Sequence, residues 1–347
     1  MYKEIDIAFA LLRAAFENNE EQITLNSQFL TLNSHDWWSL FRLMQVNHVA
    51  AMTAGVLATL DVPREVKIPW LAEADKSKRW YTYQTEVQQD IISQMSHHGI
   101  ETLVLKGTYI AQYYPVPEMR EFGDLDLYFY DRHDEADAVA QSELGVEVSN
   151  DAHHHSKYNY RGVTVESHYD FINVHYPPSN RRYETMLKEL APSPTFEVLF
   201  LLRHMAGHFA AARITLRDLV DWTLTCRALN DKVDWSRVQD IVTEYGMSSF
   251  VIALSLVAEH QLGILIPLQL GNGPDDMANR DLFERDIVYG SVDDHAADGI
   301  GRLGWKFRRW RALAWKRKMV YNDSSASLWL ASLTSHTIKP HSILHKQ

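Results

Sequence analysis

The chain has 347 residues, 46% of them hydrophobic and 23% charged, which is the balance of a globular protein with enough apolar residues for a core. Its formal net charge of −11 excludes a protein that coats nucleic acid, so a nucleic-acid partner is not favoured. The single cysteine, Cys226, excludes an intramolecular disulfide. No uncharged run is long enough to span a membrane and the N-terminus lacks a signal-peptide pattern, so we expect a cytoplasmic protein.

Residues 1–98 are predicted to form an N-terminal helical region. Ser34 is the expected N-cap for apolar residues at helical spacing that continue to Leu60. The two prolines of "VPREVKIPW" interrupt this pattern, and a longer helix is predicted from residue 71 to residue 98. Gly99 follows this helix as its C-cap.

The pattern changes in residues 99–190, which we predict to be an α+β core. "ETLVLKG" is a short apolar strand that ends at a glycine, and a short helix follows it. "FGDLDLYFY" is the next strand, and "RHDEADAVAQSEL" is a helix after it. "SKYNYRGVTVESHYDF" has the alternation of a β-hairpin that turns at Arg161-Gly162. The predicted fold class is therefore α+β, a mixed sheet flanked by N-terminal and C-terminal helical regions.

Helices return in residues 191–270. The first of them is predicted to be capped by Thr195, and Thr215 and Asp218 have the spacing of a capping box at the start of another. Asp221 is then an acid on the face of that second helix.

The last region, residues 271–347, is predicted to be a C-terminal extension, and it begins with the loop "GNGPDDMANRD". Its segment 302–318 holds eight basic residues, three tryptophans and no acid. We interpret this segment as an amphipathic helix that packs its tryptophans, in preference to a surface for RNA, acidic lipid or an acidic partner.

Asp124 and Asp126 are separated by one residue in a predicted strand, so both side chains point to the same face. At about 5 Å and an effective dielectric near 20, two carboxylates repel by about 3 kcal/mol, so a compensating interaction is expected. The pair is typical of a phosphatase nucleophile site, of the metal motif of a sugar-nucleotide glycosyltransferase, or of surface acids at a strand end. The phosphatase fits poorly, because Leu127-Tyr128 stand where a threonine is expected.

Two neighbouring motifs favour a metal-dependent phosphate site. In "VLKGT" a strand ends at Gly107 and leads into a helix, so backbone N–H groups and the Thr108 hydroxyl can hold phosphate. In "GVTVESHYD" the strand alternation puts Glu166 on the polar face, opposite two valines. Three carboxylates beside a phosphate-binding turn need counter-charge, and Mg²⁺ supplies it, since it binds one or two carboxylates together with phosphate oxygens.

These motifs together resemble the DNA polymerase β-like nucleotidyltransferase superfamily, and more closely the bacterial uncharacterised nucleotidyltransferase family. The stretches that carry the resemblance are "LVLKGTYIAQYYPVPEMREFGDLDLYF", "VTVESHYDF" and "LLRHMAGHFAAARITLRDLVDWTLTCR". In that family a Leu-Lys-Gly turn, an arginine before Gly-Asp-x-Asp and an acid-x-His strand recur. A helical histidine and a helix with an Arg-x-x-Asp-like motif follow. The resemblance covers roughly residues 35–230.

The resemblance implies transfer of a nucleotidyl group from an NTP such as ATP to an unidentified acceptor hydroxyl, with release of pyrophosphate. It implies two Mg²⁺ ions, with Mn²⁺ as the alternative, about 3.5–4 Å apart. Asp124 and Asp126 would bind both ions, whereas Glu166 would bind only the second and help to activate the acceptor. Gly107 and Thr108 would hold the β- and γ-phosphates.

The sequence departs from the family pattern at two positions. Thr108 follows the glycine where the superfamily commonly has glycine or serine, and its hydroxyl can replace that of serine. Glu166 stands where the close family usually has aspartate, which leaves open a nucleotide-binding or regulatory module that keeps the fold without catalysis. A sugar-nucleotide glycosyltransferase is the third interpretation, but it gives no reason for the Lys-Gly-Thr turn or for Glu166.

Three basic residues are further candidates for nucleotide binding. Lys106 either pairs with phosphate or lies at the surface, and Arg120 either reaches phosphate or balances the two aspartates. Arg217 is the expected ligand contact on the later helix, because Asp218 already has a capping role.

Several histidines are candidates for lining the site. His168 lies on the predicted face of Glu166. His204 and His208 have the i, i+4 spacing of metal ligands, but no third ligand is evident, so we favour a pocket wall over a zinc site. The three histidines at 153–155 are expected to begin the first hairpin strand with alternating exposure.

Overall fold

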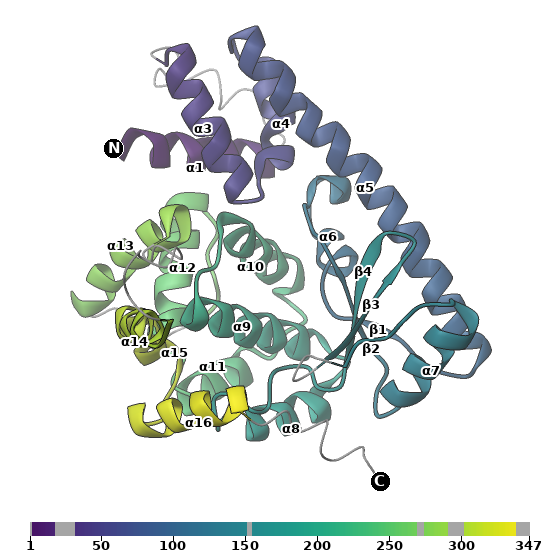
Figure 1. Ribbon diagram of the computed structural model, residues 1–347. Coiled ribbons are helices and arrows are strands. Elements are labelled where there is room, and N and C mark those ends of the chain that lie inside the picture. Colours follow the sequence, from purple (N-terminus) through teal and green to yellow (C-terminus); the bar gives the residue numbers. More distant parts are fainter. Residues whose placement is uncertain (1, 18–31, 151–154, 269–273, 291–301, 338–347) are drawn as a thin grey trace. The chain divides into compact units, whose positions relative to one another are not determined.

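The computed structural model describes residues 2–17, 32–150, 155–268, 274–290 and 302–337 (Figure 1). The chain divides into two compact units, Met1–Ala74 with Pro192–Asn322 and Asp75–Ala191 with Asp323–Gln347. The predicted divisions near residues 98, 190 and 270 stay predictions. In the described ranges, no helix combines the length and the apolar character needed to cross a membrane.

In the first unit, all regular secondary structure of the described residues is helical. The helices are α1 (Tyr2–Glu17), α3 (Ser34–Val46), α4 (Ala50–Thr59), the start of α5 (Arg64–His97), α9 (Pro194–Ala211), α10 (Leu216–Leu229), α11 (Trp235–Glu244), α12 (Ser248–Leu262), α13 (Pro274–Tyr289), α14 (Arg302–Ala312) and α15 (Ala314–Val320). Phe209, Phe250 and Phe283 are fully buried between α9, α12 and α13, with ring centroids 5.1–5.7 Å apart. These aromatic contacts form part of the core of the helical unit.

The second unit holds a four-stranded mixed sheet with the strand order β1-β2-β4-β3. The strands are β1 (Leu103–Val104), β2 (Leu125–Tyr128), β3 (His155–Tyr160) and β4 (Val163–His168). β2 and β4 run parallel, whereas the other two pairs are antiparallel. The rest of α5, α6 (Thr108–Ala111), the 3-10 helix η2 (Pro117–Met119), α7 (His133–Glu143), α8 (Asn180–Leu190) and α16 (Ser325–Thr337) complete the unit. A largely helical chain with a small mixed sheet is the predicted α+β class.

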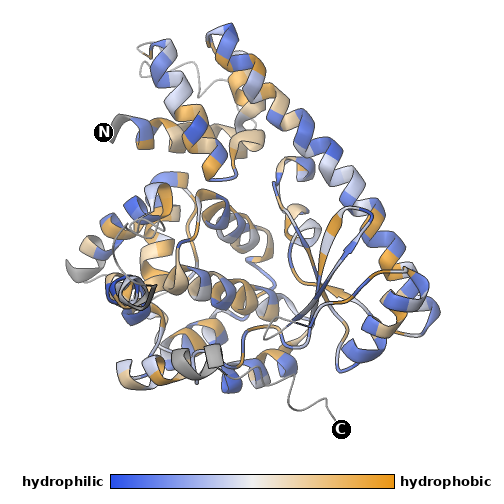
Figure 2. Cartoon of the chain, in the orientation of Figure 1, coloured by the Kyte–Doolittle hydropathy of each residue, from blue (hydrophilic) through white to orange (hydrophobic). Residues whose placement is uncertain are grey.

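The two faces of the sheet differ in polarity, because successive side chains of a strand point to opposite faces. Apolar residues of β2 and β4 are buried on one face, where they pack against α5 and α7, as shown by the cluster of Leu125, Leu127, Val163, Val165, Val87, Ile91, Met95, Ala136 and Ala140. In Figure 2 orange and blue segments follow one another along the strands. The opposite face carries the polar side chains of the same strands, among them Asp126 and Glu166.

The start of α3 differs from the prediction by one residue. Asn33, and not Ser34, is the N-cap, because its Oδ1 accepts a hydrogen bond from the Asp36 N–H at 3.0 Å. The Asp36 carboxylate in turn accepts from the Asn33 N–H at 3.3 Å. This reciprocal pair satisfies two N–H groups that the first turn of the helix leaves unbonded.

The predicted break at the second proline is wrong, since Pro69 lies inside α5. Val66 and Trp70 next to it are fully buried, and Trp70 Nε1 donates to the Ala50 carbonyl at 2.9 Å. Packing of these side chains therefore outweighs the roughly 3 kcal/mol that a proline inside a helix costs.

Ser193, and not the predicted Thr195, caps α9. Ser193 Oγ accepts from the Phe196 N–H at 3.1 Å, and Pro194 occupies the first turn, where it lacks an N–H that would be unbonded in any case. Thr195 Oγ1 instead accepts from the Asp234 N–H at 3.0 Å.

The prediction of a loop at 271–281 is wrong for most of this stretch, because α13 begins at Pro274. Proline is compatible with the first turn of a helix, so Pro274 starts the helix that its neighbours continue. Residues 271–273 lie outside the described residues.

Three local predictions are confirmed. Gly99 ends α5 with a φ of +68°, a conformation that glycine adopts without a steric cost. Arg161 and Gly162 form the hairpin turn with φ values of +52° and +82°. The Asp218 carboxylate accepts from the backbone N–H and the hydroxyl of Thr215 at 2.7 and 2.9 Å.

The basic segment 302–318 forms two helices, α14 and α15, and several of its cations are bound internally. Lys316 Nζ donates to the Ala212 carbonyl at 2.6 Å and to Asp286 Oδ2 at 2.5 Å. Arg309 donates to the Ala211 carbonyl at 3.1 Å. Both cations therefore lie at the C-terminus of α9, where the helix dipole favours positive charge. These contacts support the packing interpretation for this part of the segment.

Glu184 of α8 holds the loop that follows β4, since its two carboxylate oxygens accept from the Phe171 and Ile172 N–H groups at 3.0 and 3.1 Å. Burial raises the pKa of Glu184 from 4.5 to about 7, although these two hydrogen bonds act in the opposite direction. The folded state therefore binds the proton more tightly than the unfolded state. Its contribution to stability is complete below pH 4.5 and is lost as the pH rises through 7.

We expect this loss to be on the order of 3 kcal/mol. Glu184→Gln, which mimics the neutral carboxyl group, should flatten the pH dependence. The measurement is the unfolding free energy of both proteins between pH 5 and pH 8. Equal slopes would show that Glu184 does not titrate in this range.

Candidate active site

A glycine turn leads from β1 into α6. Gly107 has φ +61° and ψ −118°, a conformation that residues with a Cβ rarely adopt. Arg120 is buried, and its Nη1 donates to the Gly107 carbonyl at 3.2 Å. Arg120 therefore holds the backbone of the turn, and its guanidinium also lies 5.8 Å from the centre of the Phe122 ring.

The side chain of Thr108 follows this turn and points to α5. Its hydroxyl donates to Gln88 Oε1 at 2.5 Å. The predicted use of this hydroxyl for phosphate would require that bond to break. Within the single turn of α6, the Tyr109 N–H donates to the Lys106 carbonyl and the Ala111 N–H donates to the Gly107 carbonyl, both at 3.1 Å.

The segment before β2 is fixed by α5. Trp80 Nε1 donates to the Phe122 carbonyl at 3.2 Å, and Gln84 Nε2 donates to the Gly123 carbonyl at 2.8 Å. These two bonds hold the backbone on the N-terminal side of Asp124. α5 thereby fixes the segment that leads into β2. The strand was predicted to begin at Phe122, but β2 begins at Leu125, so Asp126 lies in the strand and Asp124 lies just before it.

Three carboxylates lie together on the polar face of the sheet. Asp126 of β2 and Glu166 of β4 are register partners on parallel strands. Burial raises the pKa of Asp124, and the charges of Asp126 and Glu166 raise it further, whereas Lys106 acts in the opposite direction. The mutual repulsion expected from the sequence is therefore present, and it includes the third acid.

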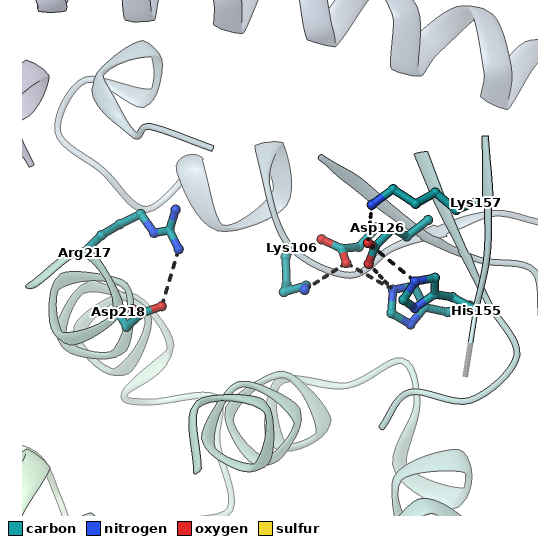
Figure 3. A network of polar contacts seen from close by, with 8 residues as sticks. Lys106, Asp126, His155, Lys157, Arg217 and Asp218 are labelled. Atoms are coloured by element: carbon teal, nitrogen blue, oxygen red, sulfur yellow. Dashed lines mark hydrogen bonds and ion pairs between the residues drawn. The ribbon is translucent and has the colours of Figure 1, made fainter. Parts of the chain in front are cut away.

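Asp126 has the strongest partners of the three acids (Figure 3). Lys106 Nζ lies 2.8 Å from Asp126 Oδ1, and His168 Nε2 lies 3.0 Å from the same oxygen. Burial alone would raise the pKa of Asp126, but Lys106 and His168 outweigh it and hold the pKa well below its usual value. Asp126 is therefore a fixed negative charge at neutral pH, even though only 4% of the residue is exposed.

Glu166 is surrounded by groups that can carry positive charge. Lys157 Nζ lies 3.3 Å and His155 Nε2 lies 3.5 Å from its Oε1, while His168 Nε2 lies 3.8 Å from its Oε2. Burial lowers the pKa of His155, although Glu166 acts in the opposite direction. A neutral imidazole is thus favoured at this end of the sheet, with a nitrogen lone pair that can bind a cation.

The donor set fits a divalent cation. Asp124, Asp126 and Glu166 offer carboxylate oxygens, which are the ligands of Mg²⁺ and Mn²⁺. The cation would relieve the repulsion that raises the pKa of Asp124. Lys106 and Lys157 already neutralise Asp126 and Glu166 in part.

The remaining predicted residues belong to the helical unit. Arg217 Nη2 lies 3.6 Å from Asp218 Oδ1, and the Arg217 N–H donates to the Asn47 carbonyl. His204 and His208 lie on α9 with ring centroids 4.4 Å apart. Neither belongs to a group of three metal-ligating side chains in the described part of the chain. Their roles in nucleotide binding or as a pocket wall stay predictions.

His155 and Lys157 were not among the residues predicted for the site. The signal for them was available, because a two-residue turn at Arg161-Gly162 fixes the hairpin register. In that register Lys157 lies opposite Glu166, and His155 lies opposite His168. The position of His155 at the start of β3 agrees with the prediction, whereas His153 and His154 lie outside the described residues.

Comparison with known proteins gives one positive result. No curated protein and no solved structure matches the chain. The sequence model of an uncharacterised nucleotidyltransferase family matches residues 33–263. This range contains the glycine turn, the three carboxylates and the helices from α9 to α12. The chain therefore belongs to the uncharacterised nucleotidyltransferase family.

Proposed function

We propose that the protein is a metal-dependent nucleotidyltransferase that uses an NTP and an acceptor hydroxyl. Membership of the family supports the class of reaction. The observation that carries the proposal for this chain is the group of Asp124, Asp126 and Glu166, whose charges act on one another beside the glycine turn.

In this reaction the acceptor oxygen forms a bond to the α-phosphorus of the NTP. The bond from that phosphorus to the oxygen that bridges to the β-phosphate breaks, and pyrophosphate leaves with its electron pair. The proton of the acceptor hydroxyl goes to a base, and we assign this role to Glu166. Its side chain is 15% exposed, and Lys157 Nζ and His155 Nε2 lie 3.3 and 3.5 Å from its Oε1.

Mg²⁺ or Mn²⁺ would be held by Asp124, Asp126 and Glu166, and would supply positive charge that neutralises the triphosphate and the leaving group. The protein's own groups keep these acids in position. Lys106 and His168 orient the Asp126 carboxylate from two directions. His168 is therefore a positioning residue in this proposal.

The turn at Gly107 is the proposed site of the β- and γ-phosphates. Its backbone can approach a phosphate closely, and we assign the N–H groups of Gly107 and Thr108 as the donors. Lys106 is 18% exposed and can exchange its contact with Asp126 for a phosphate oxygen. Arg120 supports the turn by its bond to the Gly107 carbonyl, and does not itself need to contact the substrate.

Thermal unfolding with ligands tests the proposal before any acceptor is known. An NTP at about 100 times its dissociation constant should stabilise the protein by about 2.7 kcal/mol and raise Tm by some 2–4 °C. We expect this shift with at least one of the four NTPs, only when Mg²⁺ is present. Asp124→Asn/Asp126→Asn should show no shift, because it removes two of the three carboxylates.

The other interpretations give different results in the same experiment. A larger shift with UDP-glucose than with any NTP would indicate a glycosyltransferase. An NTP shift without pyrophosphate release in the presence of acceptors would indicate a binding module. If the double variant responds like the wild type, the aspartates do not hold a metal nucleotide and the proposal is wrong.

A further inference from the structure

The end of the β3–β4 hairpin carries a group of side chains that differs from the three carboxylates. His155, Glu166 and His168 each offer one ligand atom, and these three atoms lie within 4.8 Å of one another. Within the described ranges, no other group of three or more histidine, cysteine or acidic side chains has this spacing. Two of the three ligands are nitrogens.

The hairpin fixes all three residues on one face. His155 and His168 are cross-strand partners, and Glu166 precedes His168 by two residues on the same strand. The rings of the two histidines have centroids 5.3 Å apart. Side chains that stand on paired strands are held more precisely than side chains on a loop. The group therefore has the rigidity of a built site.

The ligand atoms lie close to the spacing of a metal centre. His155 Nε2 is 3.5 Å from Glu166 Oε1, and His168 Nε2 is 3.8 Å from Glu166 Oε2. With metal–ligand bonds of about 2.0–2.1 Å, the ligands of a tetrahedral zinc ion lie about 3.3 Å from one another. The side chains are 12%, 15% and 5% exposed in the order His155, Glu166, His168, so the three ligand atoms are largely shielded from solvent.

The chemistry of these ligands selects a class of ion. Mg²⁺ prefers an octahedral shell of oxygens, whereas imidazole suits zinc, cobalt, nickel and copper. Two histidines and one carboxylate with an open fourth position is a ligand set of catalytic zinc sites. We propose that His155, Glu166 and His168 bind a divalent transition-metal ion of the zinc class, with the fourth position left to water or substrate.

This site goes beyond the proposed function, because it requires neither an NTP nor transfer of a nucleotidyl group. It shares Glu166 with the oxygen site of Asp124 and Asp126, so the two ions would have this carboxylate in common. An ion bound to His168 Nε2 would replace the contact of that nitrogen with Asp126 Oδ1, and Asp126 would keep its contact with Lys106 until Mg²⁺ binds. The protein would then hold two chemically different ions next to each other.

Lys157 is the group that competes with the ion. Its Nζ lies 3.3 Å from Glu166 Oε1, but half of the side chain is exposed, at 51%. The long side chain can therefore move its charge into water when a cation binds. This gives the site a distinguishing property, since removal of Lys157 should strengthen binding of the ion, whereas removal of a histidine should weaken it.

The test uses the full chain without a polyhistidine tag, and Co²⁺ as the probe. Bound Co²⁺ is followed by its visible absorption, and its affinity by calorimetric titration in the absence of NTP. We expect one tightly bound Co²⁺ per chain, displaced by Zn²⁺ and not by an equal concentration of Mg²⁺. His155→Ala should lower the affinity by at least about 100-fold. Lys157→Met should raise it.

Two control variants separate this site from other histidines. His153→Ala/His154→Ala removes the neighbouring histidines of the sequence, and His204→Ala/His208→Ala removes the pair on α9. Both should bind Co²⁺ like the wild type. Because His168 contacts Asp126, the folding of His168→Ala would have to be checked by circular dichroism, whereas His155→Ala and Lys157→Met decide the question without it.

The proposal is wrong if His155→Ala binds Co²⁺ as tightly as the wild type, or if the control variants abolish binding. It is also wrong if Lys157→Met weakens binding, or if Mg²⁺ displaces Co²⁺ at equal concentration. Each of these results leaves the nucleotidyltransferase proposal intact, because that proposal is tested by Mg²⁺-dependent binding of NTP.

Discussion

Replacement of Asp126 by asparagine should reduce transfer of the nucleotidyl group by about 10³-fold or more, which corresponds to about 4 kcal/mol of transition-state stabilisation. Asparagine has the shape of aspartate, but it lacks the negative charge that would hold a divalent cation. It also leaves Lys106 and His168 without the carboxylate that both contact. The loss should therefore appear in the rate, even in a protein that is fully folded.

The measurement uses NTPs labelled on the γ-phosphate and a panel of acceptors, namely sugars, aminoglycosides, RNA ends and hydroxyl-bearing peptides. Release of labelled pyrophosphate reports the rate. Asp137→Asn is the matched control. Asp137 is also a buried aspartate, but its Oδ1 accepts from Ser156, which precedes Lys157 by one residue and so faces the other side of the sheet. A similar loss in both variants would mean that the effect of Asp126 is structural.

The second large effect is expected in the helical unit, at the ion pair between Asp286 and Lys316. Both side chains are completely buried, and the oxygen and nitrogen atoms lie 2.5 Å apart. Asp286→Ala should destabilise the protein by about 3–5 kcal/mol, because it leaves an ammonium group buried without its counter-charge. The rings of Phe209 and Trp315 and the Ala212 carbonyl would remain around it, but they carry no net charge.

A double variant separates the pair from the space that it fills. Asp286→Leu/Lys316→Met replaces both charges by apolar groups of similar size, and should recover most of the lost stability. Burial lowers the pKa of Lys316, although Asp286 acts in the opposite direction, which agrees with a costly buried charge. Urea unfolding of the three proteins is the measurement. A double variant as unstable as Asp286→Ala would contradict this explanation.

The sequence was sufficient for the part of the site that depends on local patterns. Alternation along β4 correctly placed Glu166 on the other face of the strand from Val163 and Val165, since a strand has a period of two. The glycine of the turn was recognisable because its conformation excludes most other residues. These features depend on a few neighbouring residues, which a single sequence displays directly.

Features that depend on distant contacts could not be predicted in the same way. Pro69 is tolerated in α5 because the neighbouring Trp70 is fully buried and bonds to the Ala50 carbonyl, 20 residues away in the sequence. No local pattern in the sequence indicates that contact. The pairing of Lys316 with Asp286 joins two helices that are separated along the chain. Arg120 Nη1 donates to the Gly107 carbonyl, a contact that no local pattern indicates, while its predicted contact with phosphate stays a prediction.

The two-residue turn at Arg161-Gly162 lies at the opposite end of its hairpin from His155 and His168, yet it decides which side chains meet there. If one residue were inserted into β4, the strand beyond that point would exchange its two faces, and Glu166 would point into the apolar core. Substitutions in the exposed turn leave this relation unchanged as long as the backbone keeps its positive φ values. The length of the hairpin therefore has a more direct effect on the site than the identity of its exposed residues.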